Sequence, residues 1–265
     1  MSEPALSGIV ITFNEENNIL EVVESLRQVC DEVVVVDSCS TDNTVKLAQE
    51  AGAKVVIQPY LGDGFQKNVA LKHVKSLWVL SLDADERLTP ELVGEIRKID
   101  FSTTPFDGFQ VRRKNFIGTR WIKTCGWYPD YLVRIYRHDK LKYPEVKAHA
   151  AVPHDNTHRL NADIEHRTYS SITEMFAKQI EKFSTRSAKI LYEKGRKISP
   201  FAPFFHGMHT FFLNYFIRKG FLGGIDGLSI SIAMAVNSYL KYAKVIEWQR
   251  NPEMTETEDF NNSLW

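Results

Sequence analysis

The chain has 265 residues, enough for one large α/β domain with an appendage. Its 33 basic side chains balance 33 acidic ones, so the charge gives no reason to expect a nucleic-acid partner. The three cysteines (Cys30, Cys39 and Cys125) have neither disulfide-type nor metal-type spacing, which fits a reducing compartment.

The first part of the chain alternates between strand and helix patterns. Continuous apolar runs predict four buried strands, at residues 6–13, 32–36, 53–57 and 76–80. Residues 19–26 have apolar side chains at helical spacing, and we expect Asn14 to cap that helix, with residues 15–17 in its first turn. The alternation predicts right-handed crossovers in a parallel sheet.

Acidic or polar clusters follow three of these strands, at residues 12–16, 37–42 and 83–86. Ligands of such sheets bind beyond the carboxyl ends of the strands, so we expect the clusters to share one edge. Asp83 and Asp85 are two residues apart, so an extended backbone would direct both carboxylates the same way. Oxygen ligands of this kind suit Mg²⁺ or Mn²⁺. The alternative is a solvated acidic turn before a helix that begins near Pro90.

The segment at residues 62–68, Gly-Asp-Gly-Phe-Gln-Lys-Asn, adds a cation to this acidic neighbourhood. A nucleotide diphosphate would need such a cation, and Lys67 is the candidate. The alternative is a helix cap with a solvated lysine. The sequence has no Gly-x-Gly-x-x-Gly motif and no P-loop, which argues against the usual dinucleotide or NTPase site.

Taken together, these motifs resemble glycosyltransferase family 2, whose members are inverting enzymes with a GT-A fold. The resemblance rests on Thr-Phe-Asn-Glu-Glu, Val-Val-Asp-Ser followed by Thr-Asp, Gly-Phe-Gln-Lys-Asn and Asp-Ala-Asp-Glu, at residues 12–16, 35–42, 64–68 and 83–86. It implies an α/β, GT-A nucleotide-diphospho-sugar transferase fold with a UDP-sugar donor and Mg²⁺ or Mn²⁺.

The resemblance also implies which residues bind the nucleoside of the donor. Thr12 and Glu15 would line the nucleotide pocket, and Asp37 would hydrogen-bond the uracil ring. Asp42 and Gln66 belong to the same motifs and are counted as donor-binding.

On the diphosphate side, the resemblance places Lys67 near the base and the diphosphate. It places Asp83 at the ribose and the metal, and Asp85 at the metal that bridges the diphosphate. A metal there would neutralise the charge that develops on the leaving group.

The acceptor half is expected to contain a strand at residues 108–113, a loop at 115–125 and a strand at 131–137. Aromatic rings beside a carboxylate, as in Trp-Tyr-Pro-Asp at residues 127–130, suit a sugar acceptor. Ordinary aromatic core packing is the alternative. This segment and Arg-Ile-Tyr-Arg at 134–137 resemble the lipopolysaccharide-core glucosyltransferase branch, which adds glucose to heptose. The resemblance puts three residues on the acceptor side: Trp127, Tyr128 and Arg134.

The catalytic base is not settled by these motifs. In that branch the arginine-rich strand is commonly followed by a His-Glu pair, whereas this chain has Ala150 in place of the glutamate. An inverting transfer needs one base within hydrogen-bond reach of the acceptor hydroxyl. Asp130 is the first candidate, and Glu145 and His149 are the reserves.

From Ser170 onward the pattern is helical, and the uncharged run 198–217 is close to the roughly 20 residues of a membrane span. Pro200 and Pro203 interrupt the run, so we expect attachment in the membrane plane; a helical cap packed on the catalytic domain is the alternative. A lipid-linked acceptor, implied by the resemblance, favours the membrane. Three histidines without metal-type spacing are interpreted as structural: His154, His158 and His166.

The sequence thus predicts a catalytic domain at residues 1–168, with donor and acceptor halves meeting near residue 100. A C-terminal α-helical, membrane-associating region at 169–250 and a mobile acidic tail at 251–265 follow. The expected activity is metal-dependent transfer of a hexose, glucose first, from a UDP-sugar to a lipid-linked saccharide such as lipopolysaccharide inner-core heptose. We expect the enzyme to be cytoplasmic and peripheral on the inner face of the bacterial inner membrane.

Two alternatives remain open. One is a sugar nucleotidyltransferase, although that class usually opens with a phosphate loop containing glycine and arginine, and residues 12–16 have neither. The other is a nucleotide-sugar-binding relative with weak turnover, which only Ala150 supports.

Overall fold

The computed structural model describes residues 5–144, 152–153 and 155–257. Two compact units are present, Met1–Lys114 with Pro129–Arg167 and Asn115–Tyr128 with Thr168–Trp265. The first unit ends at Arg167, next to the boundary expected at residue 168. Residues 115–128 were expected in the catalytic domain but belong to the second unit, because their side chains share an apolar cluster with its helices.

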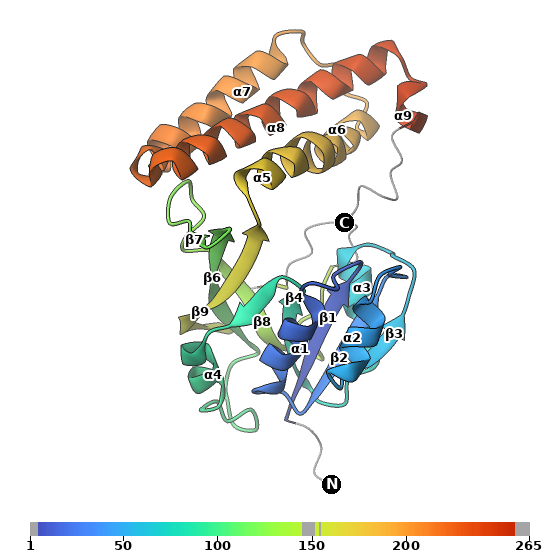
Figure 1. Ribbon diagram of the computed structural model, residues 1–265, viewed down its shortest axis with the longest axis vertical. Coiled ribbons are helices and arrows are strands. Elements are labelled where there is room, and N and C mark those ends of the chain that lie inside the picture. Colours follow the sequence, from blue (N-terminus) through green and yellow to red (C-terminus); the bar gives the residue numbers. More distant parts are fainter. Residues whose placement is uncertain (1–4, 145–151, 154, 258–265) are drawn as a thin grey trace. The chain divides into compact units, whose positions relative to one another are not determined.

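The first unit contains most of the sheet (Figure 1). Its elements, in chain order, are β1 (Leu6–Thr12), α1 (Ile19–Arg27), β2 (Glu32–Asp37), α2 (Thr44–Glu50), β3 (Lys54–Ile57), α3 (Asp63–Leu71), β4 (Trp78–Asp83), β5 (Glu86–Leu88), α4 (Pro90–Ile96), the larger part of β6 (Gly108–Ile117), β8 (Tyr131–Arg137) and the larger part of β9 (Thr157–Tyr169).

The described strands follow the order β3-β2-β1-β4-β8-β6-β9-β5, and β7 (Arg120–Trp121) pairs with β6. The first four are parallel, because β1 pairs in parallel with β2 and β4, and β2 with β3. From β4 to β8 the sheet continues antiparallel, as it does from β8 to β6 and from β9 to β5. The sheet thus has a parallel half, of the kind that binds nucleotides, and an antiparallel extension. This arrangement confirms the predicted α/β, GT-A fold class.

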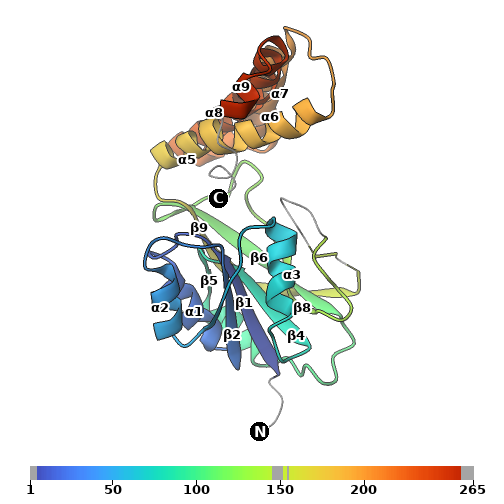
Figure 2. The same cartoon turned by 90° about the vertical axis from the view of Figure 1, so that its right-hand side faces the viewer.

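The apolar strands are buried on both faces. In β2, Val33 and Val35 pack in a cluster with residues of α1, α2 and α4, whereas Val34 and Val36 pack with Ala70 of α3. Figure 2 shows α3 on the opposite side of β1 and β2 from α1 and α2. Burial on both faces explains why the strand reads as a continuous valine run rather than as an alternating pattern.

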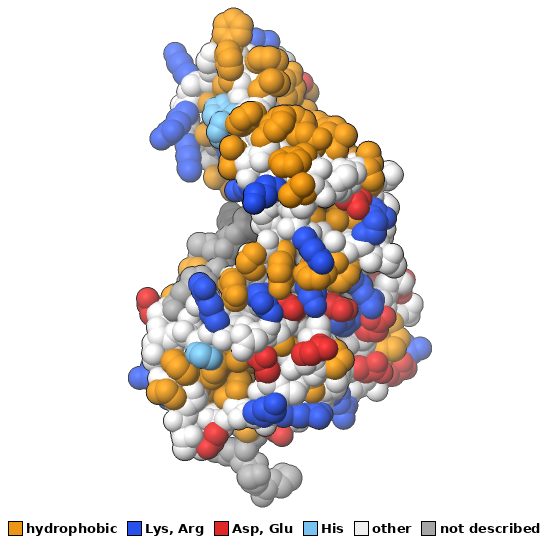
Figure 3. All heavy atoms as spheres, turned by 90° about the vertical axis from the view of Figure 1, so that its left-hand side faces the viewer, with side chains coloured by type: hydrophobic (Ala, Val, Ile, Leu, Met, Phe, Trp, Pro, Cys, Tyr) orange, Lys and Arg blue, Asp and Glu red, His pale blue; other side chains and the backbone are white. Residues whose placement is uncertain are grey.

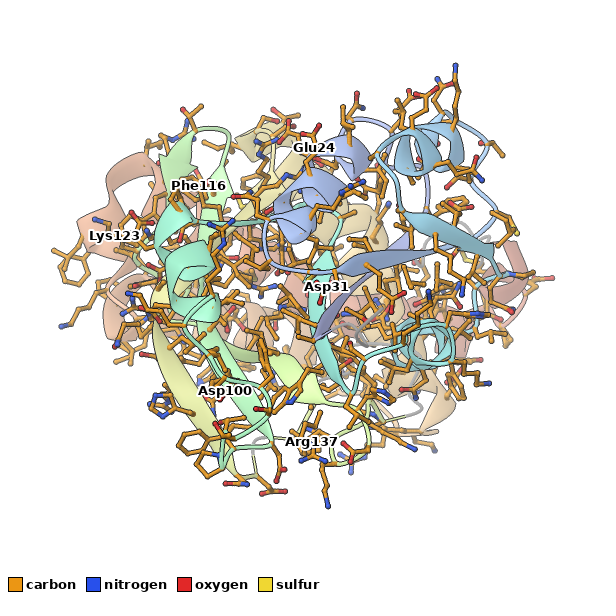
Figure 4. The ribbon with its side chains drawn as sticks, turned by 90° about the horizontal axis from the view of Figure 1, so that it is seen from below. Glu24, Asp31, Asp100, Phe116, Lys123 and Arg137 are labelled. Carbon is orange, nitrogen blue, oxygen red and sulfur yellow. The ribbon has the colours of Figure 1, made fainter. Side chains whose placement is uncertain are left out.

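The pairing register brings the three polar clusters to one edge of the sheet. Thr12 pairs with Asp37, and Ile11 pairs with Asp83, so β1, β2 and β4 end together. Figure 4 views the opposite end, where Asp31 precedes β2 and Arg137 closes β8 beside the start of β4. The charged side chains discussed below therefore lie at the carboxyl edge that the sequence predicts.

The expected helix cap at Asn14 is wrong. The helix α1 begins at Ile19, with Asn18 at its N-cap position. Asn14 instead has a φ of 52°, and its Oδ1 accepts a hydrogen bond from Thr41 N at 2.9 Å. Asparagine tolerates this left-handed conformation and readily forms local hydrogen bonds, so the same residue type serves a turn as well as a cap.

The second unit is mainly helical. Its elements are the end of β6, β7, the end of β9, α5 (Ile172–Lys178), the π-helical turn η1 (Gln179–Phe183), α6 (Ser184–Glu193), α7 (Ala202–Phe212), the π-helical turn η2 (Leu213–Ile217), the 3₁₀ turn η3 (Gly220–Gly223), α8 (Gly224–Arg250) and α9 (Met254–Thr257).

The long helix α8 is the scaffold of this unit, because α6 and α7 both pack against it (Figure 1). Its Ile230 and Ala233 share a cluster with Ile117 and Ile122, whereas Val245 and Trp248 pack with α6. The expected helices at 171–194 and 228–248 are confirmed, but the expected loop at 115–125 contains the end of β6 and all of β7.

One helical stretch among the described residues, Gly220–Arg250, is long and apolar enough to cross a membrane by length and composition. The most apolar 18-residue window of this stretch has a mean hydropathy of 1.3, and 33% of that window is buried. The run at 198–217, where the sequence pattern predicts an in-plane segment, contains α7 and η2. Of the tail expected at 251–265, residues 254–257 form α9, and residues 258–265 lie outside the described residues.

Candidate active site

Asp83 ends β4 and lies between two buried cations. Its Oδ1 accepts a hydrogen bond from Lys67 Nζ at 2.9 Å, and its Oδ2 accepts one from Arg134 Nη2 at 2.8 Å. Burial alone would raise the pKa of Asp83, but Arg134 and Lys67 outweigh it and hold that pKa well below its usual value. Burial also opposes the charge on Lys67, yet Asp83 raises the lysine pKa above its usual value. At neutral pH all three groups are therefore charged.

Glu86 and Asp130 extend this pairing. Glu86 is fully buried; it contacts the Arg134 guanidinium, and its Oε1 lies 3.4 Å from Arg113 Nη1. Arg113 also donates from Nε and Nη2 to one oxygen of Asp130, Oδ2, at 3.0 and 2.8 Å. The six side chains form an ion network of alternating sign: Lys67, Asp83, Arg134, Glu86, Arg113 and Asp130. Three cations balance three carboxylates, which is the condition under which buried charges are tolerated.

Asp85 lies in the turn between β4 and β5, outside the ion network. Its Oδ2 is 3.1 Å from His166 Nε2. The antiparallel pairing of β5 with β9 sets this contact, because Glu86 faces His166 in the register, and Arg167 N donates to the Asp85 carbonyl oxygen at 2.9 Å. His166, interpreted above as structural, thus contacts a predicted metal ligand 81 residues earlier in the chain. No local pattern signals this contact, since only the strand register creates it.

The described residues contain no preformed cluster of three or more His, Cys, Asp or Glu side chains around a metal position. Asp85 nevertheless suits a hard cation, because its Oδ1 has no hydrogen-bond partner among the residues that the structure describes. Asp83 suits one less well, since both of its oxygens already accept hydrogen bonds from cations. Mg²⁺ is commonly held by one or two protein carboxylates plus substrate phosphates, and this donor set fits that mode.

The end of β2 forms the side of the site that is predicted to bind the uracil ring of the donor. Asp37 is fully buried, and its carboxylate accepts hydrogen bonds from Ser40 N at 2.8 Å and from the Ser40 hydroxyl. Gln66 donates from Nε2 to Ser38 Oγ at 2.8 Å. Gln66 Oε1 and Thr12 Oγ1 are buried without a hydrogen-bond partner in the described part of the chain. Such atoms are costly unless a ligand or water satisfies them, so they mark a place where a polar ligand fits.

Glu15 and Asp42 join the loops that follow β1 and β2. Asp42 accepts hydrogen bonds from the Thr44 hydroxyl, from Thr44 N at 2.9 Å and from Glu16 N at 3.2 Å. Burial would raise the pKa of Asp42, but these hydrogen bonds, the Thr44 hydroxyl first, outweigh it and lower that pKa. Glu15 N donates to Thr44 Oγ1 at 2.8 Å, and its carboxylate accepts from Asn18 at 2.7 Å. These contacts fix the loops, and a direct role of Glu15 and Asp42 in donor binding stays a prediction.

The predicted acceptor-side aromatic residues belong to the second unit. The Tyr128 ring packs edge-on against Trp121, with centroids 5.1 Å apart, and Trp127 lies 6.1 Å from Tyr169. Their contact with an acceptor stays a prediction. His158 stacks on a phenylalanine ring at 4.8 Å, as a structural histidine would. Four positions named above lie outside the described residues: Glu145, His149, Ala150 and His154.

The fold and the site define a class of protein, an α/β enzyme of the GT-A type with paired charges at the carboxyl edge of its parallel strands. The model of glycosyl transferase family 2 matches residues 7–154, which is more than half of the chain. The chain belongs to glycosyl transferase family 2.

Relatives match along most of the chain. An uncharacterized glycosyltransferase of Rickettsia conorii is 32% identical over 256 residues, covering 91% of this chain and 90% of the relative. The lipopolysaccharide core biosynthesis glycosyltransferase LpsC of Rhizobium meliloti is 29% identical over 256 residues, covering 91% and 92%. A crystal structure of S. aureus TarS with UDP has a TM-score of 0.49 and 19% identity, covering 94% and 92%. Both sequence relatives extend past residue 154, so the helical unit has counterparts in them.

Proposed function

We propose that the protein transfers a hexose, with glucose as the first candidate, from a UDP-sugar to a lipid-linked saccharide such as the inner-core heptose of lipopolysaccharide. The observation that carries this proposal is the meeting of Asp37, Asp83 and Asp85 with Lys67 and Arg134 at one sheet edge of a family 2 chain. A relative named for lipopolysaccharide core biosynthesis supports the acceptor class. The family match favours this reaction over nucleotidyl transfer.

The ion network suits a diphosphate leaving group. Lys67 and Arg134 are almost completely buried, so their charges act in a medium that screens them less than water does. They share Asp83 as a counter-ion, which holds both in place before the donor arrives. Positive groups fixed in advance stabilise charge that develops in the transition state without reorganising.

Asp85 would hold a divalent metal, Mg²⁺ or Mn²⁺, with Asp83 as the second carboxylate of the proposed site. When bound, the metal supplies positive charge that neutralises the leaving diphosphate. The contribution of this chain is orientation: His166 and the Arg167 amide hold Asp85 from the neighbouring strand. Partners of this kind commonly tune metal affinity by about 10–100-fold.

Asp130 is proposed as the base that takes the proton from the acceptor hydroxyl. Arg113 holds it through Oδ2 alone, and Oδ1 has no hydrogen-bond partner in the described part of the chain. One carboxylate oxygen is thus oriented and the other is left to accept a proton. Glu145 and His149 remain the reserves, and the proton leaves as the acceptor oxygen attacks the anomeric carbon from the face opposite to UDP.

We place the enzyme on the inner face of the bacterial inner membrane, attached in the plane of the membrane through the second unit. Exposed phenylalanines of α7, η2 and η3 support this position, as do the flanking cation pairs Arg196-Lys197 and Arg218-Lys219. The packing of α8 against α6 and α7 favours this attachment over a single spanning helix.

A product assay tests the proposal. The full chain is incubated with UDP-hexoses and lipopolysaccharide acceptors, and UDP release is followed beside pyrophosphate release from UTP. We expect acceptor-dependent UDP release that Asp85→Asn abolishes. Asp139→Asn is the matched control, because Asp139 follows β8 at the opposite sheet end and pairs with Arg137. Pyrophosphate release would indicate a nucleotidyltransferase, and neither product would indicate a donor-binding relative.

A further inference from the structure

A hollow lies along the seam between α7 and α8. Its volume is about 310 Å³, at the lower end of the range for ligand pockets, about 300–1,000 Å³. Each helix contributes residues at i, i+3, i+4 and i+7, which is one face of a helix. The lining residues are Phe204, Gly207, Met208 and Phe211 of α7 with Ile232, Ala235, Val236 and Tyr239 of α8. Apart from the Tyr239 hydroxyl, every lining side chain is apolar.

A second hollow of about 400 Å³ adjoins the first, and the two share Tyr239. Its lining begins with Pro200 and Pro203 and ends at the polar residues Glu247, Arg250 and Asn251. Arg250 has no ion pair among the residues that the structure describes. The lining of the seam therefore changes along its length from apolar to charged side chains. An amphiphile has the same order of an apolar part and a charged part.

The rim of the seam exposes large apolar side chains. Phe204 is 59% exposed, Met208 56% and Tyr239 47%. Figure 3 shows one face of the molecule, on which hydrophobic side chains gather over the helices of the second unit with Lys and Arg at the margin. The helices approach closely at Gly207, where an added Cβ would lie 3.3 Å from the Ala235 carbonyl oxygen. Exposed apolar patches of this kind mark binding surfaces.

The excess of basic residues in this part of the chain favours an anionic ligand for the seam. Residues 196–250 contain seven Lys or Arg and two Asp or Glu, and one of those acids, Asp226, is already paired with Arg120 at 2.8 Å. A second copy of the chain would bring like charges together at this face. An anionic lipid surface would attract them, by about 1 kcal/mol for each cation near it.

We propose that the seam between α7 and α8 binds an anionic phospholipid of the membrane, with a hydrocarbon chain in the apolar hollow. The phosphate lies toward Arg250, and headgroup hydroxyls lie toward Glu247 and Asn251, so phosphatidylglycerol fits the polar end. This inference deepens the membrane contact proposed above and rests on it. Lipid binding in the seam would determine which face of the second unit contacts the membrane.

The test uses the full chain with phosphatidylcholine vesicles that contain phosphatidylglycerol with a photoactivatable diazirine in mid-chain. Labelled peptides are located by mass spectrometry, and vesicle binding is measured in parallel by flotation. We expect label within residues 200–212 and 232–251. Ala235→Trp fills the hollow and should lower this label about tenfold, which corresponds to about 1.4 kcal/mol. Ile225→Trp places the same ring on α8 outside both hollows and should leave it unchanged.

Arg250→Gln is the second variant, because an exposed residue at the end of α8 can change without disturbing the fold. It should lower the label and remove the preference for phosphatidylglycerol over phosphatidylcholine. Unchanged label in both Ala235→Trp and Arg250→Gln overturns the inference, as do crosslinks between seam peptides of two protein copies. Flotation without seam label overturns the lipid site but leaves the membrane contact. If the wild-type chain does not float with the vesicles, both the lipid site and the membrane contact are excluded. UDP release is measured separately and reports on sugar transfer.

Discussion

Two regions of the molecule differ from the usual pattern of burial. The ion network of the first unit buries charged side chains, whereas the α7–α8 seam of the second unit exposes apolar ones. Charged side chains are rarely buried, yet Lys67, Glu86 and Arg134 are buried in an ion network where β4 ends and β8 begins. Large exposed apolar surfaces are equally uncommon, yet α7 leaves phenylalanine rings in water. We infer that each departure marks a ligand of matching chemistry, a nucleoside diphosphate in one unit and a lipid in the other.

Mutations in the two regions should have separate effects. Changes in the ion network and at Asp85 should act on chemistry and donor affinity and leave vesicle binding intact. Changes in the seam should act on lipid binding and leave hydrolysis of the UDP-sugar, or transfer to a water-soluble acceptor, intact.

Replacement of Asp85 should have the largest effect. Asp85→Ala is expected to lower turnover by about 10³-fold or more, because groups that stabilise transition-state charge are commonly worth about 10²–10³-fold each. The fold should persist, since Asp85 lies in a turn and adds little to the core. Turnover, thermal unfolding and flotation are measured on the same preparation. Full activity of this variant in EDTA would remove the metal role from the proposal.

Replacement of Asp130 should lower kcat while the donor still binds. We expect Asp130→Asn to lose about 10²–10⁴-fold in kcat, as for other general bases, with UDP affinity unchanged. Arg113→Lys should lose less, since a lysine keeps the charge but not both hydrogen bonds to Oδ2.

Glu145→Gln and His149→Ala are measured beside Asp130→Asn. Activity that survives in Asp130→Asn and disappears in Glu145→Gln would make Glu145 the base. Activity in all three variants would leave proton removal to solvent or to the acceptor.

Replacement of Asp37 should weaken UDP binding more than it slows chemistry at saturating donor. Asp37→Ala is expected to raise the Kd for UDP by about tenfold or more, since a hydrogen bond to a charged group is worth about 1.5–3 kcal/mol. Asp31→Ala is the control, because Asp31 lies at the opposite sheet end and accepts a hydrogen bond from Ala5 N (Figure 4). Calorimetry decides the point, and equal affinity in both variants would exclude Asp37 from the donor site.

The ion network also predicts how stability depends on pH. Arg134 and Lys67 lower the pKa of Asp83 from 3.8 in spite of burial. A carboxylate with a lowered pKa stabilises the fold above about pH 4, and this contribution is lost as the pH falls through the folded-state value. Asp83→Asn should therefore cost about 1–3 kcal/mol at pH 7, less than a fully buried pair because the Asp83 side chain is 34% exposed.

The difference between the wild type and Asp83→Asn should narrow in acid. Urea unfolding of both proteins at pH 7 and near pH 3 measures it. A difference in the free energy of unfolding that stays constant between the two pH values would show that Asp83 contributes packing rather than charge.

The predictable part of the molecule is the part with local patterns. The valine-rich β2, the helices of the C-terminal region and the acidic turn at 83–86 are visible in the sequence, and the parallel register then brings Thr12, Asp37 and Asp83 to one edge. The α1 start was misplaced because Asn14 suits a turn as well as a cap.

The remaining features depend on pairing between distant segments. His166 reaches Asp85 only through the register of β5 with β9, and Arg113 reaches Asp130 only through β6 and β8. The place of residues 115–128 in the second unit depends on packing with α8, which no local spacing encodes.

Mass spectrometry of surface glycolipids tests the proposed hexose transfer in cells. Cells that lack this protein are compared with cells complemented by the wild-type chain or by Asp85→Ala. The proposed function predicts that one hexose is missing without the protein, is restored by the wild type and is not restored by Asp85→Ala. Identical glycolipids in all three strains, or full restoration by Asp85→Ala, would contradict it.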